Sequence, residues 1–383
     1  MNASSSSAND FDVVILGGGP AGCATALTLA RHGILRVLVV EAGHYDTVRI
    51  GESMPPDIRI VLEKLGVWED FLKENHETCL GSCSSWGADA LGYNDFLFNP
   101  LGNGWHLDRK RFDAFLARKV LEYGNVLYAG TRFDGCERAG VEGFRLRLKG
   151  EGKQMSMVNA RFVVDATGTR SSFARSMGAS KLFLDRLLCI NAFFALPDSA
   201  NFSKLTILEA VEYGWWYAAR LPNRRLVVAI ASDPKIIKQN QLHRRDNFLE
   251  QLEKTSHISA ELIGCPLIDD SQMICAAPSF FLDEVVGNGW LAVGDAASAY
   301  DPISSQGIYK ALSDGCRAAE AIAATLRGSD IGLGEYRLSV ASRFQQYLKN
   351  RNFFYGLEQR WPNSAFWTRR RARTAVSATW IDV

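Results

Sequence analysis

The sequence predicts an α/β fold of two domains followed by a helical C-terminal tail. The chain has 383 residues, which is enough for two domains and a large buried core. Residues 11–41 show the succession of strand, glycine-rich turn, helix and strand that is typical of a βαβ unit. Residues 76–104 and 181–283 are rich in alternating and aromatic runs, which favour a β-sheet.

The βαβ unit begins with Phe11–Leu16, an apolar and β-branched run that predicts a strand. The turn GGGPAG follows, and then ATALTLARHG, whose periodicity and good helix formers predict a helix. A second apolar run, Val37–Val40, predicts the next strand and ends at Glu41. We therefore expect a Rossmann-like domain at the start of the chain.

The glycines of this turn fit a dinucleotide-binding site. Gly17 allows the tight turn, Gly19 lets the backbone approach a pyrophosphate, and Gly22 lets the helix pack closely on the strand. The helix N-terminus adds unpaired N–H donors and the positive end of the helix dipole. Glu41 can accept hydrogen bonds from a ribose diol. Together these features predict a bound dinucleotide.

Two downstream segments favour FAD as that dinucleotide. Residues 163–164 run into the sequence DATG, and residues 290–293 run into GDAASAYDPISSQGIYKAL, residues 294–312. A carboxylate at a strand end, followed by small residues and a helix start, suits the ribityl hydroxyls and pyrophosphate of a flavin nucleotide. Residues 302–307 are expected to bring backbone N–H groups to the isoalloxazine ring.

These three segments resemble the signatures of FAD-dependent aromatic hydroxylases of the p-hydroxybenzoate hydroxylase type. The sequences GES, residues 51–53, and LDRKRFDAFL, residues 107–116, resemble the branch that includes the flavin-dependent halogenases. Within that branch GNGWHLDRKRFD, GWWYAARLP, DPISSQG and LEQRWPNSAFW are most similar to flavoproteins that mature tryptophylquinone cofactors. Those flavoproteins serve oxidases of the lysine-oxidase and glycine-oxidase type.

The resemblance implies an FAD-dependent monooxygenase that uses O₂ and hydroxylates an aromatic ring. NAD(P)H or a reduced flavin would supply electrons. The favoured substrate is a tryptophan of a partner quinocofactor oxidase, so the protein would act in cofactor biogenesis. The alternative is an aromatic hydroxylase or halogenase acting on a small or carrier-bound substrate. A flavin-binding assembly factor without oxygenase activity and a saturated-ring or prenyl reductase also remain open.

The motifs and the resemblance together predict which residues bind FAD. These are Gly17, Gly19, Pro20, Ala21, Gly22, Glu41, Ala42, Glu52, Ser53, Arg109, Asp165, Ala166, Gly168, Gly294, Asp295, Pro302, Ser305, Gln306, Gly307 and Ile308.

The sequence argues against halogenation. Similar halogenases carry the oxidised halogen on an active-site lysine between the GES motif and the second FAD contact. No lysine lies between Glu74 and Arg109. The tryptophan-rich signature GWxWxIP of those halogenases is replaced by GWWYAARLP, which starts at Gly214.

Aromatic residues are the candidates for the substrate pocket, because flat rings hold another ring by stacking at little entropic cost. Trp216 and Tyr217 are expected to face the pocket, with Trp86 and Arg220 as further candidates. No catalytic acid or base is assigned. The candidates are Glu52, which could polarise an indole N–H, and His106, which could act as a base. Capping and structural roles are the respective alternatives.

Composition sets limits on partners. The formal net charge is +1, so there is no global positive field to hold nucleic acid or an anionic membrane. No apolar run approaches the roughly 20 residues of a spanning helix, and the Ser-rich start does not read as a secretory signal. We therefore expect a cytoplasmic location. The 8 scattered cysteines suggest free thiols, and no metal site is expected.

The predicted domains are interleaved along the chain. Residues 8–75, 105–180 and 284–345 form the FAD-binding domain, and residues 76–104 and 181–283 form the substrate domain. Residues 346–383 form a helical tail rich in aromatic and Arg side chains, which are common at binding hot spots. The aromatic side chains of the tail could equally close the core, so partner docking there is left open.

Overall fold

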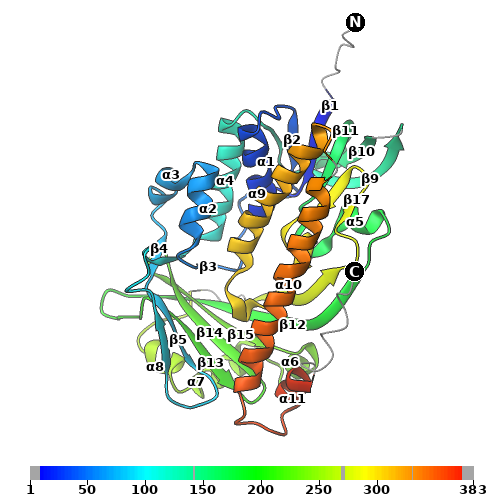
Figure 1. Cartoon of the computed structure of the whole chain (residues 1–383). Helices are drawn as coiled ribbons and strands as arrows, with labels where there is room; N and C mark the ends of the chain where they lie inside the picture. The colour runs from blue at the N-terminus through cyan, green and yellow to red at the C-terminus, as the bar shows by residue number, and fades with distance from the viewer. Residues whose placement is uncertain (1–8, 141–142, 269–271, 330, 373–383) are drawn as a thin grey trace, which may run out of the picture.

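The computed structural model describes residues 9–140, 143–268, 272–329 and 331–372. It confirms the mixed α/β fold class (Figure 1). One eight-stranded sheet and its helices form the upper part of Figure 1, and a second eight-stranded sheet forms the lower part. Residues 373–383 of the predicted tail lie outside the described residues.

The first sheet has the core order β17-β18-β11-β1-β2-β8, which is extended by β10, paired with β11, and by β9, paired with β10. The central strand β1 is parallel to both β11 and β2, as expected for a Rossmann-like domain. Its strands are β1 (Asp10–Leu16), β2 (Val37–Val40), β8 (Val126–Tyr128), β9 (Arg132–Ala139), β10 (Gly143–Lys149), β11 (Met155–Asp165), β17 (Val286–Gly287) and β18 (Trp290–Ala292).

Helices cover this sheet because parallel strands are buried on both faces. The helix α1 follows β1 directly and packs against both α4 and α9. The helices and 3₁₀ turns of this part are α1 (Pro20–Arg31), α2 (Ile58–Leu65), α3 (Trp68–Leu72), α4 (Arg109–Glu122), η1 (Glu151–Lys153), η2 (Gly168–Arg170), α5 (Ser172–Ser176), η3 (Gly294–Ala296), η4 (Pro302–Ser304) and α9 (Gly307–Leu326).

The second sheet has the order β19-β16-β12-β15-β14-β13-β5-β6. Its strands are β5 (Gly81–Ser85), β6 (Gly92–Asp95), β12 (Lys181–Ala195), β13 (Leu205–Val211), β14 (Gly214–Leu221), β15 (Arg225–Ser232), β16 (Met273–Leu282) and β19 (Ser298–Ala299). A small third sheet, with β3 (Ser53–Met54), β7 (Gly104–His106) and β4 (Glu77–Cys79), completes the strands of the described residues.

One feature of this part differs from the expectation. Residues 234–261, expected to lie within a β-rich region, contain α6 (Pro234–Gln239), α7 (Arg245–Glu253) and α8 (Ile258–Glu261). Their apolar side chains, including Phe248 and Leu252, join a core that covers one face of the second sheet. Burial of this face therefore requires helices that a search for alternating strands does not find.

The C-terminal helices tie the two sheets together. α10 (Ile331–Leu357) runs from the upper to the lower part of Figure 1, and α11 (Ala365–Ala372) lies at its lower end. The predicted boundary between residues 345 and 346 therefore falls inside one continuous helix. Tyr355, Phe366 and Trp367 are buried in a core shared with the second sheet. These three aromatic side chains close that core.

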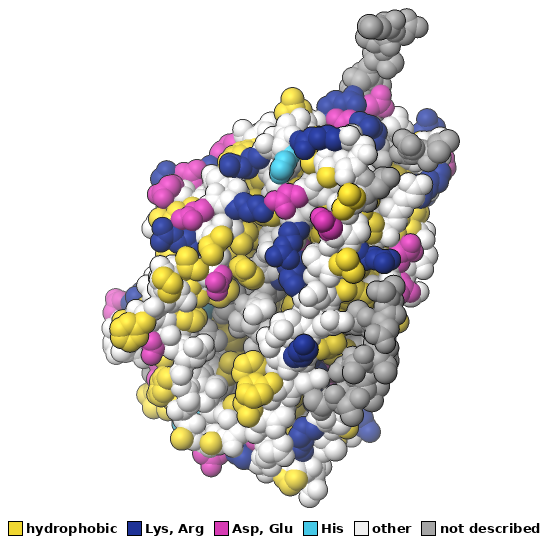
Figure 2. All heavy atoms as spheres, in the orientation of Figure 1, with side chains coloured by type: hydrophobic (Ala, Val, Ile, Leu, Met, Phe, Trp, Pro, Cys, Tyr) yellow, Lys and Arg dark blue, Asp and Glu magenta, His cyan; other side chains and the backbone are white. Residues whose placement is uncertain are grey.

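The surface agrees with the near-neutral composition. On the face shown in Figure 2, acidic and basic side chains are interspersed over the upper part of the molecule. Among the described residues, no helix combines the length and apolar character needed to cross a membrane.

Candidate active site

A cleft of about 620 Å³ lies at the carboxyl ends of β1, β2 and β11. This is where ligands bind in open parallel sheets. The sequence-predicted residues that line it are Gly17, Gly19, Pro20, Ala21, Glu41, Ala42, Arg109, Ala166, Gly168 and Asp295.

The glycine-rich turn shapes this cleft in the expected way. Gly17 has φ +111°, and a Cβ there would stand 2.2 Å from the carbonyl oxygen of Ala166. A Cβ on Gly22 would stand 1.9 Å from the carbonyl oxygen of Gly17, so only glycine lets α1 approach the turn. Gly19 has open space instead, with nothing within 4 Å of an added Cβ. The backbone at Gly19 is therefore accessible to a ligand at the α1 N-terminus.

Glu41 is held in one orientation at the end of β2. One oxygen, Oε2, accepts a hydrogen bond from the backbone N of Gly18 at 2.7 Å. The other, Oε1, accepts from the backbone N of Gly43 at 3.0 Å and from Arg49 at 3.1 Å. The carboxylate is thus fixed at the edge of the cleft, where a ribose diol of a bound dinucleotide would meet it.

Arg109, the first residue of α4, stands where the cleft continues into a second cavity. Its Nη1 donates to the carbonyl oxygens of Ile50 and Gly51 at 2.8 and 2.9 Å. It also forms an ion pair with Asp113 at 3.2 Å. Because these contacts fix the guanidinium, Arg109 brings a positive charge to the junction without a large loss of entropy.

The second cavity has a volume of about 520 Å³ and lies between the segment 299–311 and one face of the second sheet. It shares six lining residues with the first cleft, so the two spaces are continuous: Pro20, Arg49, Arg109, Thr169, Asp295 and Ala311. Its other walls include Glu52, Ser53, Cys189, Asn191, Trp215, Tyr217, Met273, Cys275, Pro302, Ser305, Gly307 and Ile308.

Four residues predicted to bind FAD line neither space. The Asp165 carboxylate accepts hydrogen bonds from Thr167 and from the backbone N of Ala174, so it caps the turn after β11. The burial of Asp165 raises its pKa. The other three are Gly22, which packs inside the βαβ turn, Gly294 and Gln306.

The structure corrects part of the expected substrate pocket. Tyr217 lines the second cavity, and its hydroxyl shares a hydrogen bond of 2.9 Å with Ser53 Oγ. Trp216 does not line it, because adjacent residues of β14 point to opposite faces of the sheet. Trp216 is buried against Phe248 instead, with ring centroids 5.0 Å apart. The strand alternation places Trp215 beside Tyr217 in the cavity wall.

Two other pocket candidates lie outside the cavity. The indole of Trp86 donates to the carbonyl oxygen of Phe354 at 2.7 Å and packs edge-on against Trp367. Arg220 forms an ion pair with Glu77 at 3.3 Å and does not line the cavity. Both side chains stabilise contacts between elements, and neither reaches the space beside Tyr217.

His106 is a structural residue. It is fully buried in β7, and its Nε2 shares a hydrogen bond of 2.8 Å with the hydroxyl of Thr206. Burial lowers the pKa of His106 to about 4, so the ring is neutral near pH 7. It lines neither cavity, so the structure gives no support to its candidate role as a base.

Glu52 contributes a buried carboxyl group to the wall of the second cavity. It is 4% exposed, and among the described residues its Oε1 has no hydrogen-bond partner. Burial raises the pKa of Glu52 to about 7, and the positive charge of Arg109 opposes that effect. A carboxyl group with such a pKa exchanges a proton near neutral pH, as acid-base catalysis requires.

Glu52→Gln is expected to change how stability depends on pH. The ordinary pKa of Glu52 is 4.5 and the folded value about 7, so the unfolded chain loses its proton first as the pH rises. The free energy of unfolding therefore falls as the pH rises from 4.5 to about 7, and it stays constant at higher pH. In FAD-free protein, E52Q should be more stable than the parent by roughly 3 kcal/mol above pH ~8 and equal to it below pH ~4. Urea unfolding at both pH values measures this difference, and an equal difference at both would contradict it.

The two connected spaces fit FAD. Gly19 and the α1 N-terminus leave room for a pyrophosphate, Glu41 is oriented for a ribose, and the backbone of residues 302–307 borders the second cavity. The shape and the donors of these spaces are therefore suited to a flavin nucleotide.

The fold and this site define an FAD-binding flavoprotein. The family model described as "FAD binding domain" matches residues 10–350, and the chain belongs to that family. It is an FAD-dependent oxidoreductase of the group that includes the flavin-dependent halogenases.

Two curated relatives match most of the length of this chain. The protein named "Putative FAD-dependent oxidoreductase LodB", from Marinomonas mediterranea, is 30% identical over 96% of this chain and 98% of its own length. The 1H-pyrrole-2-carbonyl-[peptidyl-carrier protein] brominase of Pseudoalteromonas luteoviolacea is 30% identical over 84% of this chain and 79% of its own length.

Solved structures share the fold. The myxobacterial chondrochloren halogenase CndH has a TM-score of 0.86 at 21% identity, covering 98% of this chain and 92% of that chain. The peptidyl tryptophan dihydroxylase QhpG is described as essential for tryptophylquinone cofactor biogenesis. Its structure has a TM-score of 0.76 at 22% identity, covering 94% of this chain and 79% of that chain.

Proposed function

We propose that this flavoenzyme hydroxylates an aromatic ring held in the second cavity. The observation that carries the proposal is that a cavity with a largely apolar wall is continuous with the flavin cleft and contains no lysine among the described residues that line it. Reduced FAD with O₂ supplies the oxygen atom, and the protein orients the ring and excludes water.

The cavity residues divide this work among them. Trp215 and Tyr217 offer flat apolar surfaces on which an aromatic substrate can stack. Ser53 fixes the hydroxyl of Tyr217 and so the plane of its ring. Glu52 is placed to accept or return a proton at a polar atom of the substrate.

Halogenation is the second candidate, and the names of several relatives favour it. The lysine on which similar halogenases carry the halogen has no counterpart in the described cavity wall. We therefore place hydroxylation first.

The comparisons favour a substrate presented by a protein. The named brominase and a related chlorinase act on a pyrrole carried by a peptidyl-carrier protein, and QhpG acts on a peptidyl tryptophan. A carrier-bound ring has the stronger support, because the brominase is 30% identical whereas QhpG shares the fold alone at 22% identity. Hydroxylation of a tryptophan of a partner quinocofactor oxidase is the narrower form of the proposal.

Intact-mass analysis of two protein substrates tests this function. The FAD-loaded enzyme is supplied with NAD(P)H, a flavin reductase, bromide and heavy-isotope O₂. One reaction contains a pyrrole-2-carbonyl carrier protein, and the other contains the precursor of a tryptophylquinone oxidase. A gain of labelled oxygen on either substrate supports hydroxylation and identifies the ring. A gain of bromine supports halogenation instead, and two unchanged masses contradict both candidates.

A further inference from the structure

Asp301 lies in the wall of the second cavity, directly before the segment that borders the flavin space. Its carboxylate is completely buried, and both of its oxygens are engaged. Oδ1 accepts from the backbone N of Ile303 at 3.1 Å, and Oδ2 accepts from the hydroxyl of Tyr355 at 2.7 Å. The positive charge of Arg351 lies 3.7 Å from Oδ2. The conformation of this loop is therefore coupled to α10.

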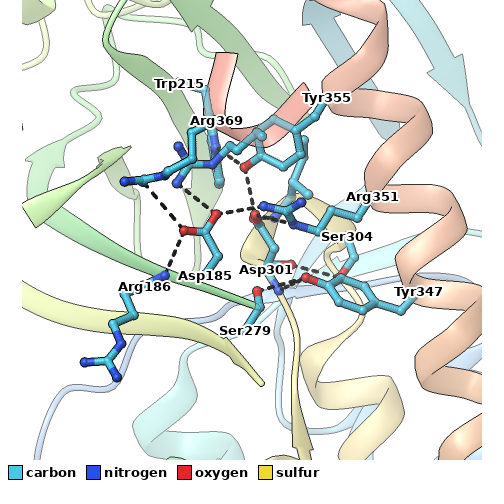
Figure 3. A network of polar contacts seen from close by, with 12 residues as sticks. Asp185, Arg186, Trp215, Ser279, Asp301, Ser304, Tyr347, Arg351, Tyr355 and Arg369 are labelled. Atoms are coloured by element: carbon cyan, nitrogen blue, oxygen red, sulfur yellow. Dashed lines mark hydrogen bonds and ion pairs between the residues drawn. The ribbon is translucent and has the colours of Figure 1, made fainter. Parts of the chain in front are cut away.

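Tyr355 connects Asp301 to the opposite wall of the cavity. Its hydroxyl accepts a hydrogen bond of 3.2 Å from the indole N–H of Trp215, as Figure 3 shows. An indole N–H can only donate, so the single hydroxyl proton of Tyr355 is left for the Asp301 carboxylate. The direction of both hydrogen bonds is thus fixed by chemistry.

Trp215, Tyr355 and Asp301 thus form a hydrogen-bonded relay, and its two ends belong to different parts of the molecule. Trp215 lies on β14 of the second sheet, and Asp301 precedes η4, which leads into the α9 helix of the FAD-binding part. Both residues line the cavity, whereas Tyr355 does not. Tyr355 is completely buried, so water does not compete for its hydroxyl.

We propose that Tyr355 is a positioning residue for the flavin site, which holds the loop of residues 301–307 and the indole of Trp215 at a fixed separation through its hydroxyl. The inference rests on FAD binding in the connected cavities and not on the identity of the substrate. A failed oxygenation experiment therefore leaves its test intact.

The test uses the FAD-loaded full chain and the variant Tyr355→Phe, which keeps the ring and removes only the hydroxyl. We expect the Kd for FAD to rise about tenfold, because a buried hydrogen bond to a charged group is lost. The long-wavelength absorption band of the bound flavin and the indole N–H resonance of Trp215 should both move.

Tyr336→Phe is the matched control. Tyr336 is also buried on α10, and its hydroxyl donates to the carbonyl oxygen of Ala292 at 2.8 Å, apart from the relay. Y336F should lower stability but leave the Kd for FAD within about twofold and the flavin band in place. An equal change in Y336F and Y355F, or an unchanged flavin in Y355F, would overturn the proposal.

A double-mutant cycle with Trp215→Phe separates the relay from general packing. The relay predicts that the effects of W215F and Y355F on FAD binding are not additive, because each breaks the same connection. Additive effects would show that the two side chains act independently. If Y355F does not fold, W215F alone tests the proposal. The relay requires that W215F shift the flavin band and weaken FAD binding, and an unchanged flavin in W215F would overturn it.

Discussion

Gly22→Ala is expected to lower the free energy of unfolding by about 3 kcal/mol. The added Cβ would stand 1.9 Å from the carbonyl oxygen of Gly17, which is a backbone atom and not the end of a flexible side chain. Overpacking of a core typically costs about 1–3 kcal/mol and occasionally more, and a clash with a backbone atom lies at the upper end of that range. Soluble yield, urea unfolding and the FAD content of the purified protein measure the loss.

Gly19→Ala is the matched control for this substitution, because it adds the same methyl group three residues earlier on open space. G19A should unfold at the same urea concentration as the parent, while its affinity for FAD should fall by at least about tenfold, because the methyl group occupies the space of the ligand. Normal FAD binding by G19A would show that the pyrophosphate does not approach this residue. Normal stability of G22A would show that α1 can shift on the sheet.

Asp185→Asn is expected to lower the free energy of unfolding by about 3–5 kcal/mol. Asp185 contacts Arg351 at 2.7 Å and Arg370 at 2.9 Å, and all three side chains are buried. Figure 3 shows Asp185 at the centre of this network. Removing its charge leaves the two guanidinium groups without their common partner. Urea unfolding near pH ~7 measures the cost.

The same variant should also flatten the loss of stability in acid. Burial raises the pKa of Asp185, but the charges of Arg370 and Arg351 outweigh that effect and hold it below the ordinary value of 3.8. A lowered carboxyl pKa contributes stability above the unfolded value, and that contribution is lost as the pH falls through the folded value. D185N lacks this contribution at every pH. A parallel acid profile in the parent and D185N would contradict the argument.

Arg59→Ala provides the comparison for Asp185→Asn. Arg59 pairs with Glu63 at 2.8 Å on the surface of α2, where both side chains are exposed. Its removal should change the free energy of unfolding by no more than about 0.5 kcal/mol.

The flavin cleft was predictable because its signals are local. The strand, the turn containing Gly17 and Gly19, and the acid at position 41 follow one another within one βαβ unit, and each has its own physical requirement. The structure places these residues around one cleft. Asp165 is one of the four predicted residues that line neither space, because its carboxylate accepts hydrogen bonds from neighbouring backbone N–H groups that the sequence does not reveal.

The substrate space was less predictable because it depends on strand register and long-range packing. Trp215 and Trp216 are neighbours in an aromatic run, and only the sheet decides which of them faces the cavity. Alternation alone excludes the pairing of Trp216 with Tyr217 on one face, so this error was avoidable. The contact between Tyr355 and Asp301 joins residues 54 positions apart and has no local signal.

The helix α10 determines how the two sheets unfold. Its 27 residues extend about 40 Å, with Tyr336 bonded to β18 of the first sheet and Tyr355 packed on the second. Neither sheet can lose its structure without exposing side chains of the helix that also supports the other. Heating should therefore melt both halves in one cooperative transition, even though the segments that form them alternate along the chain.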